Sequence, residues 1–399
     1  MNAPLHTAPA LIGSDAEALE TANALAEVFR TGAAQRDRER LLPHAELERF
    51  SRSGLWAISV PKAFGGAGVS SVTLAKVIAR IARADGSLGQ IPQNHFYALE
   101  VLRINGTPEQ QRRLYGEVLQ GVRFGNALAE LGTRTSQDRT TRLIADGENF
   151  RIDGRKFYAT GALYAQRIPT LAVDEQGVGH LAFVPRHAPG LEIIDDWSGF
   201  GQRTTGSGSV LLRQVPVAAA DVVPFQASFE RPTTVGPFAQ LLHAAIDIGI
   251  ARAAYEDTLT FVRNSSRPWI DAGVDKASDD PLTLKAVGRL AIHLHAAEAL
   301  LERAGEILDL AQAAPDAASV AAASIAVAEA RAIGTEASLA LSSKLLELAG
   351  SRATLAEHNL DRHWRNARTH TLHDPVRWKY HAVGNYYLND ALPPRRGTI

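Results

Sequence analysis

The first third of the chain shows helical spacing of its apolar positions. From Ser14, a candidate helix cap, small and apolar residues recur every three or four positions as far as Phe29, and this spacing forms one face of a helix. The pattern returns at Leu74 and continues to about Leu119. The run SGLWAISVPKAFGGAGVS, between these stretches, ends in proline and glycines and indicates a loop. The first part of the chain is therefore predicted to be helical.

The pattern changes near Phe124, where short apolar runs separated by glycine and proline replace the helical spacing. The candidate strands span residues 149–157, 170–173, 180–184, 191–194 and 209–212. A parallel crossover needs a helix between its strands, and no helical pattern interrupts this region. The sequence therefore favours an antiparallel barrel or sandwich.

Helical spacing returns at Phe238 and continues to the end of the chain. Val287, Leu294, Leu301 and Leu308 repeat every seven residues, as in the seam between two packed helices. The many alanines and glycines allow such helices to approach closely. We therefore predict an α-helical domain over residues 1–123, with residues 1–13 flexible, a β domain over 124–235 and an α-helical bundle over 236–399.

The composition narrows the class of protein. Of the 399 residues, 45% are hydrophobic, which suffices for a large core. The 42 lysines and arginines balance 43 aspartates and glutamates, so the chain lacks the charge excess that favours nucleic acid or an anionic membrane. The absence of cysteine excludes disulfides, thiolate metal sites and thiol catalysis. Because neither an 18-residue apolar window nor a signal-peptide pattern occurs, we expect a cytoplasmic protein without a membrane partner.

Two histidines near the C-terminus are the clearest candidates for chemistry, because the common motifs are absent. No P-loop, GxGxxG, GxSxG or HExxH pattern occurs. His370 and His373 lie three residues apart in ARTHTLHDPVRW and precede Asp374. They admit three interpretations: a metal site, a histidine pair stabilised by the dipole of a helix end, or an active site. Pro375 is expected to end the helix there, which speaks against the metal site.

Four further positions have both a functional and a structural interpretation. His95 in PQNHFYALE can line a pocket or fill the core. Asn126 can form the polar wall of a pocket at the domain junction, and Thr160 can do the same, or both can be ordinary strand residues. Trp197 can be a core anchor or an exposed stacking platform. The residues alone leave both interpretations open at each position.

Together these segments resemble the acyl-CoA dehydrogenase superfamily over nearly the whole chain. SGLWAISVPKAFGGAGVS and IARADGSLG are similar to its N-terminal signature, and FGNALAELGTRTSQD and DGRKFYATGA to its two flavin-contacting strands. GFGQRTTGSGSVLLRQVPVAAADVV is similar to the closing strands of its β domain. The resemblance implies an α+β fold with an N-terminal helical domain, a central antiparallel β domain and a C-terminal four-helix bundle.

The departures from the dehydrogenase pattern concern FAD and the thioester. In the dehydrogenases, a glutamate at a helix end removes the proton alpha to the thioester. Here Asp374, one methylene shorter, stands at that position, and a misplacement of about an ångström costs about a hundredfold in rate. Ala129-Glu130-Leu131 replaces a Thr-Glu-Pro run, and LLELAGSR replaces the Gln-x-x-Gly-Gly loop that contacts the adenosine diphosphate half of FAD. The segments that resemble the isoalloxazine site are not among these departures.

THTLHDPV, ELAGSRAT and GNYYLNDALPP resemble the flavin-dependent monooxygenase branch of this fold, which includes dibenzothiophene monooxygenases and bacterial sulfur-acquisition oxidoreductases. This resemblance implies a two-component enzyme and a homotetramer. Reduced FMN comes from a separate NAD(P)H:flavin reductase and reacts with O₂ to a C4a-hydroperoxyflavin. One oxygen then passes to a small organosulfur compound in sulfur acquisition. FAD remains the alternative cofactor.

The resemblance also assigns residues to this chemistry, with no metal among the ligands. The implied catalytic residues are His373, His370, Asn126 and Thr160. The implied flavin contacts are Asn126, Leu128, Ala129, Tyr158, Thr160 and Arg365, and the implied substrate contacts are His95, Tyr97 and Trp197. By the same resemblance, Thr160 reaches the N5–C4 edge of the flavin.

The expected chemistry agrees with these residue types. A histidine supplies the proton that a peroxyflavin needs, and neutral donors such as Asn126 and Thr160 hold its distal oxygen. A strong carboxylate base there would favour elimination of hydrogen peroxide. Two rival functions remain: an FAD-dependent acyl-CoA dehydrogenase with Asp374 as base, and a catalytically silent helical scaffold of the same fold.

Overall fold

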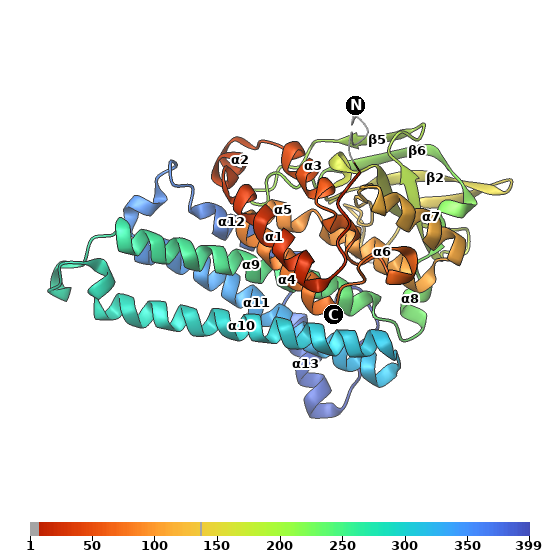
Figure 1. The fold of residues 1–399 in the computed structure, drawn as a ribbon. Coiled ribbons are helices and arrows are strands. Elements are labelled where there is room, and N and C mark those ends of the chain that lie inside the picture. Colours follow the sequence, from red (N-terminus) through yellow and green to blue (C-terminus); the bar gives the residue numbers. More distant parts are fainter. Residues whose placement is uncertain (1–7, 136–137) are drawn as a thin grey trace.

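The computed structural model describes residues 8–135 and 138–399, and its elements follow the predicted order (Figure 1). The N-terminal helices are α1 (Asp15–Arg30), α2 (Ala33–Glu39), α3 (His44–Arg52), α4 (Ser71–Ala84), α5 (Gly86–Gln90), α6 (Gln93–Asn105) and α7 (Pro108–Leu119). Ser14 caps α1, as predicted, because its side chain accepts a hydrogen bond from the backbone of Glu17. Of the segment expected to be flexible, residues 1–7 lie outside the described residues, and the backbone N–H of Ala10 donates to Arg52 at 2.9 Å.

The central part forms one seven-stranded sheet with the order β5-β6-β2-β1-β3-β4-β7. Its strands are β1 (Arg142–Asp146), β2 (Asn149–Lys156), β3 (Arg167–Val173), β4 (Gly179–Pro185), β5 (Leu191–Ile194), β6 (Ser209–Val217) and β7 (Val222–Pro224). Each predicted strand overlaps one of these, and β1 and β7 are additional. Ser136 and Gln137, at the end of the first flavin-strand motif, lie outside the described residues.

The sheet is mixed, whereas the sequence favoured a purely antiparallel arrangement. β1 and β2 form an antiparallel hairpin, and β1 also pairs in parallel with β3. The chain reverses direction after β1 and again after β2, so β3 runs in the same direction as β1. Because β3 lies on the far side of β1 from β2, the parallel pair needs no crossover helix.

The C-terminal part is built on three long helices, α9 (Val235–Asn264), α10 (Pro281–Ala313) and α11 (Ala317–Ala349). Three shorter helices accompany them: α8 (Ala227–Glu230), α12 (Asp361–Thr371) and α13 (Arg377–Asn389). α4 packs along α9 and α10 (Figure 1). Gly249 permits this approach, since a Cβ there would lie 2.4 Å from the carbonyl oxygen of Ala79. One large core therefore joins the two helical parts, and a smaller core lies within the sheet.

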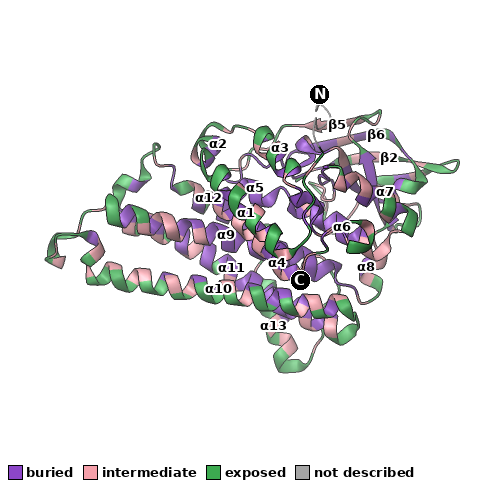
Figure 2. Cartoon of the chain, in the orientation of Figure 1, coloured by how far each residue is buried: buried purple, intermediate pink, exposed green. Residues whose placement is uncertain are grey.

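The seven-residue repeat of α10 is only partly buried within one chain. Leu294, Leu301 and Leu308 lie in the core, whereas Leu284 near the start of α10 is exposed. Figure 2 shows the same exposure along the outer face of this helix. α11 is long and apolar enough to cross a membrane by length and composition alone. However, 67% of its most apolar window is buried in this fold, as expected for the central helix of a bundle.

The change of element type suggests where the domains divide. Helices give way to strands between Leu119 and Arg142, and strands give way to helices between Pro224 and Ala227. We retain the boundaries after residues 123 and 235 as a proposal for the domain division.

Candidate active site

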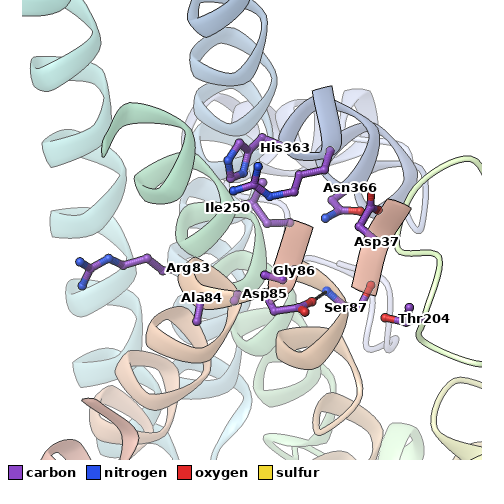
Figure 3. A pocket seen from close by; sticks show the side chains of 13 residues that line it. Asp37, Arg83, Ala84, Asp85, Gly86, Ser87, Thr204, Ile250, His363 and Asn366 are labelled. Carbon is purple, nitrogen blue, oxygen red and sulfur yellow. Dashed lines mark hydrogen bonds between the residues drawn. The ribbon is translucent and has the colours of Figure 1, made fainter. Parts of the chain in front are cut away.

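The position of α12 is set by contacts with other parts of the chain. Arg365 in its middle pairs with Asp37 of α2, with 2.6 Å between Nη2 and Oδ2. Asn366 accepts a hydrogen bond from the backbone N–H of Gln202 at 2.6 Å. Asp37 and Asn366 line a small cavity of about 10 Å³ (Figure 3), which is the size of one water molecule. These contacts fix the orientation of α12 and therefore the position of its last turn.

Arg365, an expected flavin contact, has all five of its N–H groups engaged within the chain. Asp37 accepts two of these hydrogen bonds, and Asp361, Asn359 and the carbonyl oxygen of Phe200 accept the others. Although burial lowers the pKa of Arg365, its carboxylate partners raise this pKa above the ordinary value. The structure therefore uses Arg365 to anchor α12 and leaves it no donor for a flavin.

His370 occupies the last turn of α12 and is buried. Its Nδ1 lies 2.5 Å from Oδ1 of Asp247 in α9, and Oδ2 of Asp247 pairs with Arg331 of α11. A carboxylate only accepts, so Nδ1 of His370 carries a proton and its Nε2 is an acceptor. Burial and the nearby Arg331 cation hold the pKa of His370 well below its usual range. This imidazole is therefore neutral at physiological pH.

His243 in α9 completes a group of three imidazoles, His243, His370 and His373, which we call the histidine cluster. Nδ1 of His243 lies 3.0 Å from Nε2 of His370. Its ring faces that of His373, with centroids 4.1 Å apart and planes inclined by 36°. Burial and the two other histidines lower the pKa of His243 well below its usual value. The sequence pattern alone did not single out His243, although it lies four residues before Asp247 and so shares a helix face with it.

His373 is the solvent-facing member of the histidine cluster, and Asp374 beside it is buried. The His373 side chain is 46% exposed, and its Nδ1 lies 3.0 Å from Oδ2 of Asp374. The same oxygen accepts from Nε2 of Gln240 at 2.8 Å. Burial would raise the pKa of Asp374, but His373, Lys379 and Arg331 hold it well below its usual range. The carboxylate is therefore ionised and already paired.

Asn126 joins the two strand-end segments that were expected to contact a flavin. Its Nδ2 donates to the carbonyl oxygen of Tyr158 at 3.1 Å, and its Oδ1 accepts from the backbone N–H of Leu128 at 3.1 Å. Tyr158 has a left-handed φ of 56° and is 46% exposed. Its ring lies 6.2 Å from that of Trp197 in an edge-to-face arrangement. Asn126, Leu128, Tyr158 and Trp197 are therefore neighbours.

Thr160 lies at the end of a chain of three hydroxyl groups whose direction is set by a carbonyl. Oγ1 of Thr205 donates to the carbonyl oxygen of Gln202 at 3.0 Å, so Oγ of Ser207, 2.7 Å away, must donate to Thr205. The proton of Ser207 is then used, and Thr160, 2.7 Å from Ser207, must donate to it. Thr160 keeps free lone pairs but no free proton, so it can only accept from a ligand. Because the backbone N–H of Gln202 also donates to Asn366, these hydroxyl groups connect Thr160, on the strand side of the site, to α12.

His95 and Tyr97 of α6, which were expected to line the substrate side, are packed inside the protein. His95 is fully buried: its Nε2 lies 2.8 Å from the carbonyl oxygen of Trp56, and its Nδ1 accepts from the backbone N–H of Phe124 at 3.0 Å. Burial lowers the pKa of His95 to about 3. Tyr97 packs against Phe225 with ring centroids 6.3 Å apart, and burial raises its pKa. Of the two interpretations of His95, these contacts favour the core residue.

The metal-site interpretation of His370 and His373 depends on which partners these side chains find. Within residues 8–135 and 138–399, no group of three or more histidine, aspartate or glutamate side chains is arranged to hold a metal ion. Both ring nitrogens of His370 are hydrogen-bonded, so it has no free ligand atom.

Glu130, near Asn126, pairs with the buried Lys156 at 2.7 Å and so stabilises the strand end.

Comparisons with known proteins agree with this architecture. The acyl-CoA dehydrogenase N-terminal domain matches residues 16–122, and the acyl-CoA dehydrogenase C-terminal domain matches residues 241–378. The chain therefore belongs to the acyl-CoA dehydrogenase family, as the sequence resemblance predicted.

Full-length relatives indicate the branch of the family to which the chain belongs. The dibenzothiophene monooxygenase of Mycolicibacterium goodii is 33% identical over 392 residues, which cover 94% of either chain. The probable FMNH2-dependent monooxygenase SfnC of Pseudomonas putida is 32% identical over 402 residues, which cover 98% of either chain. The chain thus belongs to the flavin-dependent monooxygenase branch of the family.

Solved structures show the same relationship. FMN-bound TdsC from Paenibacillus sp. A11-2 superimposes with a TM-score of 0.92 at 32% identity and covers 96% of this chain and 100% of TdsC. The methanesulfinate monooxygenase MsuC from Pseudomonas fluorescens superimposes with a TM-score of 0.88 at 31% identity and covers 96% of this chain and 99% of MsuC. The similarity includes all three parts of the fold.

Proposed function

We propose that this protein is the oxygenase component of a two-component monooxygenase, which uses reduced FMN and O₂ to oxygenate a small organosulfur compound in sulfur acquisition. The observation that carries the proposal is the arrangement at the end of α12. An exposed imidazole, His373, is available for proton transfer, whereas the neighbouring carboxylate of Asp374 is buried and paired. The similarity to dibenzothiophene and methanesulfinate monooxygenases supports the substrate class.

The strand side of the site fits a reduced flavin better than an oxidised one. Reduced FMN, when bound, supplies the two electrons with which one oxygen atom of O₂ is added to the substrate and the other leaves as water. A reduced isoalloxazine carries an N–H at N5, and Thr160 offers only acceptor lone pairs because its proton is held by Ser207. We place Leu128, Ala129 and Tyr158 along the flavin.

Asn126 and His373 then act on the oxygen side. The amide of Asn126 has two N–H groups and uses one for Tyr158, so one donor remains for an oxygen atom. Asp374 accepts from Nδ1 of His373, so Nε2 is the atom at which this imidazole gives up and regains a proton. His370 acts from behind the site, since both its nitrogens are bonded to protein groups.

We place the substrate beside Trp197. Its indole N–H donates to the carbonyl oxygen of Gln202 at 3.0 Å, which fixes the ring plane and leaves its face for an apolar or sulfur-containing molecule. We retain Tyr97 and His95 as expected substrate-side residues, although their contacts are with Phe225 and with Trp56 and Phe124 in the core. The dehydrogenase function is less favourable, because its base would be Asp374, whose Oδ2 already accepts hydrogen bonds from His373 and Gln240.

The same proposal includes an assembly and a partner. A separate NAD(P)H:flavin reductase delivers reduced FMN, and the oxygenase is a cytoplasmic homotetramer. An open groove of about 1010 Å³ lies between α10 and α11 and is lined in part by Leu282, Leu290 and Ile292. Leu282 and Ile292 are each 73% exposed. A helix pair from a second copy of the chain would cover these exposed apolar side chains, and the charged residues of the groove, Lys285, Arg289, Lys344 and Glu347, would lie at the contact.

Oxygen uptake tests the proposed function. The protein is mixed with FMN, NADH, a flavin reductase and either dibenzothiophene or methanesulfinate, and the sulfur product is quantified against O₂ consumed. We expect product with at least one of these compounds and none without reductase. Oxidation of an acyl-CoA with an artificial electron acceptor would instead support the dehydrogenase. Failure to bind or oxidise any flavin would support the silent scaffold.

A further inference from the structure

One member of the histidine cluster, His243, has no task in the proposed function. It is buried in α9 (Figure 1), yet it contacts His370 in the last turn of α12 and His373 just after that helix. We infer that His243 is a positioning residue for His373: the series Asp247–His370–His243 holds the His243 ring neutral and in one tautomer, so that the proton of the histidine cluster stays on His373. The catalytic consequence of this inference rests on the proposed function. The tautomers of His370 and His243 follow from the hydrogen bonds and do not depend on that function.

The hydrogen bonds of the series run in one direction. Asp247 can only accept, so Nδ1 of His370 donates to it and Nε2 of His370 accepts. His243 must then donate from its own Nδ1, which leaves a lone pair on its Nε2. None of the residues that the structure describes donates a hydrogen bond to this Nε2. Each imidazole in the series therefore has its tautomer set by the one before it, with Asp247 as the origin.

The charges around the series keep its two histidines neutral. The cations that face it are Arg331 from α11 and Lys379 from α13, and the anions are Asp247 from α9 and Asp374 after α12. Two cations and two carboxylates balance, so a further positive charge on a buried imidazole would have no counter-charge. Burial accordingly lowers the pKa of both His243 and His370. His373, by contrast, is partly exposed and bonded to Asp374.

The ring contact between His243 and His373 also restrains the orientation of the His373 ring. At a centroid separation of 4.1 Å and an inclination of 36°, the two rings are in contact in a tilted arrangement. A neutral ring beneath an imidazolium is favourable, whereas a charged one would repel it. The contact therefore helps to keep Nδ1 of His373 toward Asp374 and leaves Nε2 for the reaction.

Two substitutions separate the hydrogen bond from the ring contact. His243→Phe keeps a ring against His373 but cannot donate to His370, whereas His243→Asn keeps an amide donor near the position of Nδ1 but removes the ring. ¹⁵N NMR of histidine-labelled protein without flavin measures the tautomer and charge of each imidazole from pH 5 to 8. The ratio of sulfur product to O₂ consumed is measured over the same pH range.

We expect His370 in the wild-type protein to remain neutral with its proton on Nδ1 throughout this range. In His243→Phe, Nε2 of His370 loses its donor and its lone pair becomes free, so a larger fraction of His370 is protonated at the acidic end of this range than in the wild-type protein, and the product ratio falls severalfold with its pH profile displaced. In His243→Asn, His370 stays neutral, but the product ratio still falls because the ring contact is lost.

His363 provides a matched control. It is a buried histidine seven residues earlier in α12, and its Nε2 lies 2.7 Å from Asp257, outside the histidine cluster. His363→Phe should lower the unfolding temperature without changing the charge of His370 or the pH profile. The inference is overturned if His370 is protonated or has its proton on Nε2 in the wild-type protein. It is also overturned if His243→Phe changes only the unfolding temperature, or if His363→Phe displaces the pH profile equally. Absence of any sulfur product from the wild-type protein would instead contradict the proposed function and leave the NMR result to decide the tautomers.

Discussion

Nδ1 of His373 lies 3.0 Å from Oδ2 of Asp374, and this contact gives two adjacent residues different tasks. By the sequence resemblance, Asp374 corresponds to the catalytic glutamate of the dehydrogenases, but it is buried and bonded to Gln240 as well. His373 is exposed, and its Nε2 has no hydrogen-bond partner among residues 8–135 and 138–399. Under the proposed function, the histidine is therefore the residue that would carry a reaction proton, and the aspartate would support it.

Replacing His373 by alanine should separate oxygen consumption from product formation. Loss of a general acid–base group typically costs about 10² to 10⁴ in rate, so sulfur product should fall by this order. Reduced FMN should still be oxidised, and its two electrons should reduce O₂ to hydrogen peroxide. Stopped-flow spectra and peroxide assays measure both events.

Asp374→Asn is the matched variant, because it removes the charge and keeps the shape. It should lower stability, since Lys379 loses a partner, but it should reduce product formation less than His373→Ala does. The opposite order, with Asp374→Asn inactive and His373→Ala intact, would make the monooxygenase assignment of these residues wrong.

The hydroxyl chain predicts a preference for reduced over oxidised FMN. Ser207→Ala frees the proton of Thr160, which can then donate to an oxidised flavin nitrogen. We expect the affinity for oxidised FMN to rise several-fold and that for reduced FMN to fall. Anaerobic fluorescence titrations measure both dissociation constants. Thr160→Ser, which keeps the hydroxyl group, should leave their ratio unchanged, and an equal change in both variants would refute the role of the chain.

FMN should bind at least as tightly as FAD. LLELAGSR lies at the end of α11 and lacks the glutamine that the dehydrogenases use near the adenosine diphosphate half of FAD. The second nucleotide therefore gains no contact from that motif. Calorimetry compares the two flavins under the same conditions, and a tenfold advantage for FAD, about 1.4 kcal/mol, would contradict this prediction.

Stability should fall in mildly acidic solution because buried histidines are held neutral. Burial lowers the pKa of His95 to about 3 and those of His243 and His370 well below their usual value. Between about pH 6.5 and 5, the unfolded chain then binds more protons than the folded chain. The free energy of unfolding therefore falls as pH falls, by up to about 1.4 kcal/mol per pH unit for each histidine.

Buried carboxylates act in a lower pH window. Burial alone would raise the pKa values of Asp257 and Glu130, but their hydrogen-bonded partners lower both to about 2. The contribution of these carboxylates to the free energy of unfolding is therefore lost only as pH falls below about 4.5. Urea unfolding at pH 7 and pH 5 isolates the histidines. His95→Gln should reduce the difference between the two pH values, and His295→Gln on the exposed face of α10 should not. Equal stability of the wild-type protein at both pH values would contradict this account.

The resemblance predicts a homotetramer in solution, and the groove between α10 and α11, where Leu282 and Ile292 are exposed, is the face that we expect a second copy to cover. Light scattering at micromolar concentration should give about four times the chain mass of 42.9 kDa. Ile292→Glu places a charge on the exposed apolar face and should yield smaller species without unfolding the chain. A monomeric wild-type protein would contradict the assembly, and Glu306→Gln on the same helix serves as a substitution that adds no charge to the groove.

Local patterns in the sequence determined the order of elements. The period of the apolar positions predicted helices, strands and helices, and Ser14 was recognised as a cap because capping depends on neighbours within one turn. The motif around His370 and His373 indicated the end of a helix, whereas the residues alone left a metal site, a helix-end pair and an active site open. The family resemblance determined the class of enzyme, because its motifs occur in order over the whole chain.

Only the tertiary structure decided which of these residues meet. The contact between His243 and His370 joins positions 127 residues apart, and it depends on how α9 and α12 pack against α11. Asp374, which the sequence offered as a base, becomes buried because Gln240 and Lys379 converge on it from two helices. A single sequence records side-chain chemistry and local period, whereas burial, tautomer and pairing arise from residues that are distant along the chain.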